Sequence, residues 1–214
     1  MTLLPVAPPF FGGGVNTLFF ANAGSPYTPA VLRGTWDRFS ITERKLAITP
    51  VGASSTHNHA ESGPNDQVHN DCIARYVTSA LQSNITVSGN IKFCIGAQNL
   101  SNPGGYNLRS HIWVTTGATD TVRGTLLSNW QGSTEIPATG QGLEQTLAIS
   151  TVNALAGDYI CWEFGWHFSN ESGTETLTHW YGNTGVTLLG AGDTNVTTRP
   201  AWVLFQNVLL PLAS

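Results

Sequence analysis

Charged side chains are scarce in this chain of 214 residues. Only 10% of the residues are Asp, Glu, Lys or Arg, against about 25% in a typical soluble domain. The 9 basic and 13 acidic residues give a net charge of −4, and they form no basic stripe of the kind that marks nucleic-acid-binding proteins. We therefore expect no nucleic-acid partner.

Cysteine is also rare, and the three that occur, Cys72, Cys94 and Cys161, are far apart in the sequence. They form no C-x-x-C pair, and an odd number does not indicate a disulfide framework. We expect buried free thiols in a chain that is made in a reducing cytoplasm.

Long apolar runs are missing, because no stretch approaches the 18 residues of a membrane-spanning helix. The first residues contain prolines at positions 5, 8 and 9 and no basic residue, which does not fit a signal peptide. We expect no membrane partner.

Catalytic motifs are missing as well. The sequence contains no G-x-S-x-G, no Walker loop and no H-E-x-x-H, and each of these would indicate a particular reaction. We expect a non-enzymatic protein with no catalytic residue, no cofactor and no bound metal.

One segment leaves two interpretations open. It carries a cluster of imidazoles and carboxylates: His57, His59, Glu61, Asp66, His69 and Asp71. Histidines two residues apart share a strand face, which is a usable arrangement for a divalent metal. Ser, Asn, Gly and Pro in the same segment favour a solvated polar loop instead, and the loop is the preferred interpretation.

Glycine, by contrast, is abundant, with 23 residues, which is typical of strands joined by tight turns. The clearest strand is 157–168, where large apolar residues recur at every second position: Ile160, Trp162, Phe164, Trp166 and Phe168. Alternate residues of a strand share one face. The pattern therefore predicts a central strand that begins at the turn Gly157–Asp158 and buries these five residues between two sheets.

Similar but weaker patterns predict ten to twelve short strands and no helix. They cover residues 17–20, a stretch ending at 48, 72–78, 84–95, 108–114, 122–127, 143–149, 176–181, 186–189 and 202–209, and residues 50–70 and 131–141 are expected to be loops. This spacing indicates an all-β fold, an antiparallel β-sandwich or jelly roll. We expect one domain over residues 17–214.

Residues 1–16 are expected to form an extended N-terminal arm. The segment combines prolines and three consecutive glycines with large apolar side chains: Leu3, Leu4, Val6, Phe10 and Phe11. Proline favours an extended path and glycine a flexible joint. Such an apolar arm needs a surface to lie on, either on a neighbouring subunit or on its own domain.

Several motifs resemble a group of tailed-bacteriophage proteins that are encoded among virion structural genes. They are Tyr27-Thr28-Pro29, 33–37 (RGTWD), 75–79 (RYVTS), 119–127 (TDTVRGTLL), 156–158 with 163–165, and 199–203 (RPAWV). The likeness runs from about residue 17 to the end. It implies a β-sandwich virion protein whose motifs mark the fold and name no ligand.

The resemblance implies a capsid decoration (cement) protein located on the capsid surface of the virion. Its partners would be the major capsid protein and further copies of itself, as trimers where such proteins occupy three-fold positions. The alternative is a tail-fibre or receptor-binding module that contacts host glycans. Exposed tryptophans would stack on the sugar, and Trp113, Trp130 and Trp180 have polar neighbours and are the candidates.

Structural roles are expected for residues within these motifs: Trp36, Arg123, Gly157, Asp158, Glu163 and Trp202. Arg123 and Glu163 are predicted to form one ion pair that joins adjacent strands, because Arg and carboxylate can bond bidentately. A simply exposed Glu163 is the alternative.

Overall fold

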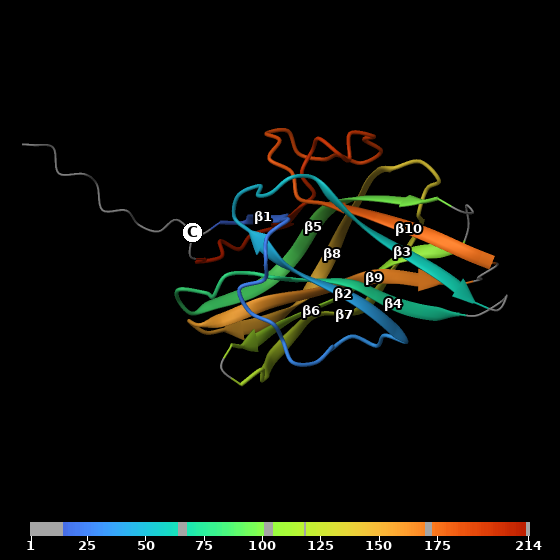
Figure 1. Ribbon diagram of the computed structural model, residues 1–214. Helices are drawn as coiled ribbons and strands as arrows, with labels where there is room; N and C mark the ends of the chain where they lie inside the picture. Colours follow the sequence, from blue (N-terminus) through green and yellow to red (C-terminus); the bar gives the residue numbers. More distant parts are fainter. Residues whose placement is uncertain (1–14, 64–67, 101–104, 118, 170–172, 213–214) are drawn as a thin grey trace, which may run out of the picture.

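The computed structural model describes residues 15–63, 68–100, 105–117, 119–169 and 173–212. These residues form an all-β fold without a helix (Figure 1), as the alternating patterns predicted. The strands are β1 (Thr17–Phe20), β2 (Arg38–Ala47), β3 (Ser55–Gly63), β4 (His69–Val77), β5 (Ile85–Asn99), β6 (Tyr106–Thr116), β7 (Val122–Glu135), β8 (Gln141–Ala154), β9 (Asp158–Phe168), β10 (Gly173–Tyr181) and β11 (Trp202–Phe205).

The strands pair in the order β3-β10-β5-β11-β1-β2-β4-β9-β6-β7, and β8 pairs with β5 off this path. The pairing is antiparallel except between β2 and β4, which run parallel. The predicted antiparallel pairing therefore fails at this one pair, because the segment between β2 and β4 includes β3, which crosses to β10. The sheet is mixed.

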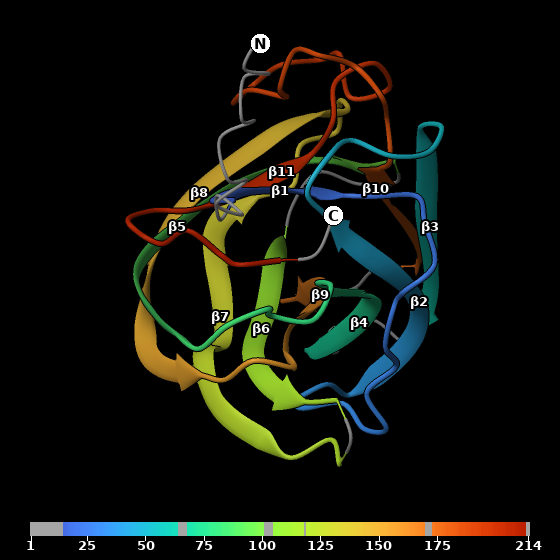
Figure 2. The ribbon, with the colours of Figure 1, turned by 90° about the vertical axis from the view of Figure 1, so that its left-hand side faces the viewer.

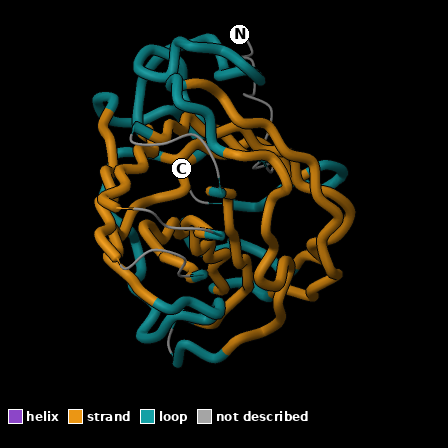
Figure 3. Tube along the Cα trace, turned by 90° about the vertical axis from the view of Figure 1, so that its right-hand side faces the viewer, coloured by secondary structure: helices purple, strands orange, loops and turns teal. Residues whose placement is uncertain are grey.

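The long curled sheet places two layers face to face, with β5 and β8 on one side of Figure 2 and β4, β9 and β6 nearer its centre. Aromatic side chains fill the space between them. The Trp162 ring on β9 lies 5.1 Å from Phe93 on β5 and 5.3 Å from Phe20 on β1, edge to face in both cases. This arrangement is compatible with a sandwich. The tube in Figure 3 shows how loops close its ends.

β9 lies at the centre of its layer, between β4 and β6. All five of its predicted core residues are fully buried, so that prediction is confirmed. The turn before β9 contains Gly157 with φ of 88°, a backbone conformation that glycine adopts without steric cost. On the opposite face of β9, Cys161, Glu163 and Gly165 are buried and Tyr159 and His167 are half-buried, because residues of another segment lie on it.

Three predicted loops and strands differ from the structure. Most of 50–70 is strand, since β3 pairs over its whole length with β10. β7 continues through 131–135, where a loop was predicted, because β6 supplies its partners. Residues 186–189 form no strand. In each case the outcome depends on a distant pairing partner, which local composition does not reveal.

The arm residues Leu3, Leu4, Val6, Phe10 and Phe11 lie outside the described residues. Val15, where the described chain starts, forms an isolated bridge with Leu210. Its N–H donates to the Leu210 carbonyl at 2.9 Å, and the Leu210 N–H donates back at 2.7 Å. Among the described residues there is no helix that is long and apolar enough to cross a membrane.

Candidate functional site

Residues 21–37, between β1 and β2, are named here the cover segment. They include no strand. Residues 21–23 bond to the end of β2 and to the loop that follows it, and residues 29–35 bond to side chains of β4, β9 and β7 on the face that points away from the aromatic core. The segment contains Gly24, Pro26, Pro29 and Gly34, residue types that break regular structure. Its backbone groups therefore need partners outside the segment.

Glu163 on β9 provides one set of partners. Its side chain is fully buried and accepts hydrogen bonds from the Arg33 N–H at 2.9 Å, the Gly34 N–H at 2.7 Å and Trp36 Nε1 at 2.8 Å. Burial raises the pKa of Glu163, while the hydrogen bonds from Trp36, Gly34 and Arg33 and the charge of Arg75 act in the opposite direction. The carboxylate holds one end of the cover segment onto the sheet.

Arg75 on β4 provides the complementary set. Its guanidinium donates to the Val31 carbonyl at 3.1 Å and to the Pro29 carbonyl at 2.7 Å. It also donates through Nε to Glu43 on β2 at 3.0 Å and lies 4.0 Å from Glu163. The buried guanidinium thus binds carbonyls, and the buried carboxylate binds N–H groups, of the same segment.

Asp120 and Asn129 complete the attachment from the β6–β7 side. Asp120 accepts from the Ala30 N–H at 2.9 Å and forms an ion pair with Arg33 at 3.3 Å. Asn129 accepts from the Thr35 N–H at 2.7 Å. Burial tends to raise the pKa of Asp120, but hydrogen bonds from Tyr27 and Ala30 and the charge of Arg33 outweigh it, so the pKa lies below its usual range.

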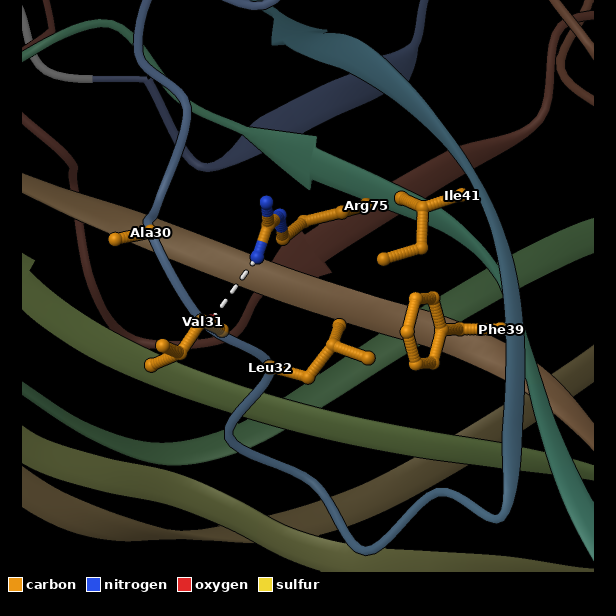
Figure 4. Close-up of a pocket in the computed structure, with 6 residues that line it drawn as sticks. All are labelled: Ala30, Val31, Leu32, Phe39, Ile41 and Arg75. Carbon is orange, nitrogen blue, oxygen red and sulfur yellow. Dashed lines mark hydrogen bonds between the residues drawn. The ribbon is translucent and has the colours of Figure 1, made fainter.

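A pocket opens between the cover segment and β2. It has a volume of about 310 Å³ and is lined by Ala30, Val31, Leu32, Phe39, Ile41 and Arg75. Figure 4 shows that Leu32 from the cover segment and Phe39 and Ile41 from β2 point toward one another, with Arg75 beside them. Phe39 is 69% exposed and Val31 48% exposed. We name this feature the cover pocket.

The predicted pairing of Arg123 with Glu163 is wrong. Arg123 donates to both carboxylate oxygens of Asp158, at 3.0 and 3.2 Å, while Glu163 lies beneath the cover segment with Arg75. Asp158 also accepts from the Leu155 N–H at 2.8 Å and so holds the turn before β9. The alternative of an exposed Glu163 is wrong as well, because it is fully buried.

Trp36 and Trp202, the two tryptophans that were predicted to be structural, differ in burial and in the group that they bind. Trp36 is half-buried and binds Glu163 through its indole N–H. Trp202 is buried on β11 and donates to the Leu189 carbonyl at 2.7 Å. This bond attaches the long segment between β10 and β11 to the sheet.

The histidine segment does not form the predicted polar loop, because His57 and His59 lie on strand β3. His57 Nδ1 lies 3.0 Å from the Thr42 hydroxyl, and His59 Nε2 lies 2.7 Å from Asp71 Oδ2. These contacts join β3 to β2 and β4 of the facing layer. Within the described ranges, His, Cys, Asp and Glu form no group of three or more suited to a metal ion, and Asp66 lies outside those ranges.

The tryptophans proposed for sugar stacking are not exposed. Trp113 is fully buried, packed with Val77 and Cys161, so its predicted exposure is wrong. Trp130 and Trp180 are half-buried and pack against the hydrophobic clusters. Trp113 therefore has no exposed face for a sugar.

The three cysteines are buried free thiols, as predicted. Burial raises the pKa of each thiol, to about 12 for Cys94. A raised pKa disfavours the reactive thiolate. The thiols therefore act as small core residues.

The binding of the cover segment's backbone by Arg75 was not predicted from the sequence. Both lie in motifs that carry the phage resemblance, 27–37 and 75–79. The available signal was Arg75 within the otherwise apolar stretch Cys72–Val77, because a buried guanidinium requires several acceptors.

No protein-family model and no curated protein matches this chain. Solved structures overlap it at low similarity. An aminopeptidase from a marine sediment Thaumarchaeota archaeon has 9% identity and a TM-score of 0.48, covering 93% of this chain and 38% of that one. A CocE/NonD family hydrolase from Staphylococcus aureus has 8% identity and a TM-score of 0.46, covering 92% and 37%. An α-amino acid ester hydrolase has 11% identity and a TM-score of 0.46, covering 93% and 36%.

These overlaps correct the expectation that the chain is not an enzyme, because the three structures just named are two hydrolases and an aminopeptidase. That expectation is withdrawn. The chain spans little more than a third of the length of each structure. At TM-scores below 0.5, the overlap assigns no activity to this chain.

Proposed function

We propose that this protein is a structural component of a phage virion, a capsid decoration subunit that binds neighbouring proteins through apolar surface. The observation that carries the proposal is the cover pocket. Five of its six lining residues are apolar, and the most exposed of them, Phe39, is 69% exposed. Large exposed aromatic side chains in a concave surface are typical of protein contacts.

The chemistry of the pocket favours a protein surface over a charged small molecule. Arg75 is the one charged residue in its lining, and its guanidinium already donates to Pro29, Val31 and Glu43. An incoming anion would have to displace these bonds. The pocket can therefore recognise a partner only by shape and apolar contact. Such recognition suits capsid and decoration subunits, which meet over fixed surfaces.

The rigid attachment of the cover segment supports the same function. Side chains from β4, β9 and the β6–β7 region hold its backbone, so the pocket wall is ordered before a partner arrives. Preorganisation lowers the entropy cost of binding. The glycan-binding alternative has less support, since Trp113 is fully buried and Trp130 and Trp180 are half-buried.

The test is the number of copies on purified particles of the phage that encodes the chain. We expect a band of intensity comparable to that of the major capsid protein on a stained gel. Particles without the gene should break at a lower temperature than complete particles. Only a few copies per particle, together with inhibition of infection by the free protein, would instead indicate a receptor-binding module and overturn the proposal.

A further inference from the structure

The cover pocket requires an occupant that is apolar and uncharged. Its volume of about 310 Å³ lies at the lower end of the range for binding pockets, roughly 300–1,000 Å³. The side chains of Leu32, Phe39 and Ile41 converge on it (Figure 4), and the donors of Arg75 are used within the fold. A few large apolar side chains on one extended segment would match this space.

The sequence contains one segment with this chemistry outside the described structure. Residues 1–14 include no charged residue and hold three prolines and five large apolar side chains: Leu3, Leu4, Val6, Phe10 and Phe11. Proline-rich segments lose little entropy on docking, and aromatic-lined grooves bind them in many domains. The pocket and the segment are therefore complementary in chemistry.

The position of Val15 gives this segment a fixed starting point. Two backbone hydrogen bonds tie Val15 to Leu210 beside β1 and β11, whereas the pocket lies at the cover segment and β2. At about 3.3 Å per residue, 14 residues reach at most about 46 Å. That length is enough to leave one copy and contact an adjacent one.

We infer that the arm, residues 1–14, of one copy binds the cover pocket of a neighbouring copy. The inference rests on the proposed function, under which copies of the chain meet on the particle. Each copy carries one arm and one pocket. If each arm binds the pocket of the next copy, a closed ring of copies leaves no arm and no pocket unoccupied. Phe10 and Phe11 are the anchors, because aromatic side chains contribute most to such contacts.

Complementation between two full-length variants tests this inference. Phe39→Asp places a charge in the pocket, and the double variant Phe10→Asp/Phe11→Asp places charges in the arm. We expect the unaltered chain to be oligomeric in analytical ultracentrifugation and each variant alone to be monomeric. An equimolar mixture should form a 1:1 heterodimer, since the pocket variant retains a working arm and the arm variant retains a working pocket.

Controls separate binding from folding. Val186→Asp changes a side chain that is 99% exposed and lies outside the pocket, and it should leave the oligomer unchanged. Thermal unfolding should give similar Tm values for all variants. If Phe39→Asp fails to fold, Leu32→Asp takes its place, because Leu32 lines the same pocket and its side chain points toward Phe39 and Ile41 (Figure 4).

Four outcomes overturn the inference: an unaltered chain that is monomeric, variants that keep the oligomer, an oligomer lost equally in Val186→Asp, or a mixture that stays monomeric. A monomeric mixture with a high copy number on particles would refute arm exchange and leave the decoration function standing. A heterodimer from a chain that is absent from particles would refute the decoration function and leave arm exchange standing.

Discussion

The carboxylate of Glu163 and the guanidinium of Arg75 lie 4.0 Å apart beneath the cover segment. Glu163 accepts hydrogen bonds from backbone N–H groups of that segment, and Arg75 donates to its carbonyls. Two opposite charges thus satisfy both kinds of backbone group in the middle of the cover segment, between Pro29 and Gly34. Buried charges are tolerated when they are paired and hydrogen-bonded in this way.

Replacing Glu163 by Gln should change how stability depends on pH. Burial raises the pKa of Glu163 above its ordinary value of 4.5, so the folded chain binds the proton of this carboxyl more tightly than the unfolded chain does. The stability from that preference is present below pH 4.5 and is lost as the pH rises through the folded pKa. Gln does not titrate. The unfolding free energy of the unaltered chain, relative to Glu163→Gln, should therefore fall as the pH rises.

Urea unfolding of both proteins, at steps from about pH 4 to about pH 7, measures this difference. The comparison cancels the contributions of other titrating groups. A difference that stays constant over the whole range would contradict the assigned environment of Glu163.

Gly34→Ala should destabilise the fold because the cover segment leaves no room for a side chain there. An added Cβ would lie 2.5 Å from Trp36 Nε1 and 3.0 Å from Glu163 Oε2. Overpacking of this kind costs about 1–3 kcal/mol, or roughly 2–12 °C in Tm for a chain of this size. Gly24→Ala in the same segment is the matched control, since nothing lies within 4 Å of its Cβ. Equal Tm values for the two variants would refute the close approach.

A pair of double-mutant cycles should locate the partner of Arg123. Arg123 bonds Asp158 at two points, so Arg123→Met and Asp158→Asn should be non-additive in the free energy of unfolding. Asp158→Asn should cost more on its own, because Asp158 is buried and also binds Leu155. Arg123→Met and Glu163→Gln should be additive, and coupling in this second cycle would restore the pairing that the structure contradicts.

His179 should remain neutral in the folded chain. It is fully buried, its Nδ1 lies 3.3 Å from the Gly96 carbonyl, and its Nε2 lies 2.9 Å from the Tyr76 hydroxyl. A carbonyl only accepts, so Nδ1 carries the hydrogen and Nε2 accepts from Tyr76. Burial lowers the pKa of His179 to about 3.

The consequence is a loss of stability in acid. The neutral imidazole contributes stability that is present above the ordinary pKa of 6.5 and is lost as the pH falls toward 3, at about 1.4 kcal/mol per pH unit. Histidine ring resonances in NMR check the protonation state directly. A His179 resonance that titrates near 6.5 in the folded protein would refute this environment.

The predictions that succeeded were those that depended only on the residues of one short segment and not on the strands that pair with it. In β9, five large residues at every second position required a buried face, whichever strands lay beside it. β1 was predicted with its observed bounds, Thr17–Phe20, because turn-forming residues follow it. β3 was missed, since its polar residues resemble a loop until β10 pairs with it.

The sequence by itself determined the all-β class, the core face of β9 and the burial of the thiols, because alternation and composition act locally along the chain. Only the tertiary structure decided which charges meet. Glu163 could pair with any arginine, and the choice of Arg75 over Arg123 follows from β4 lying beside β9. The cover pocket has the same origin. Its walls come from the cover segment, β2 and β4, and no local pattern records that these parts lie together.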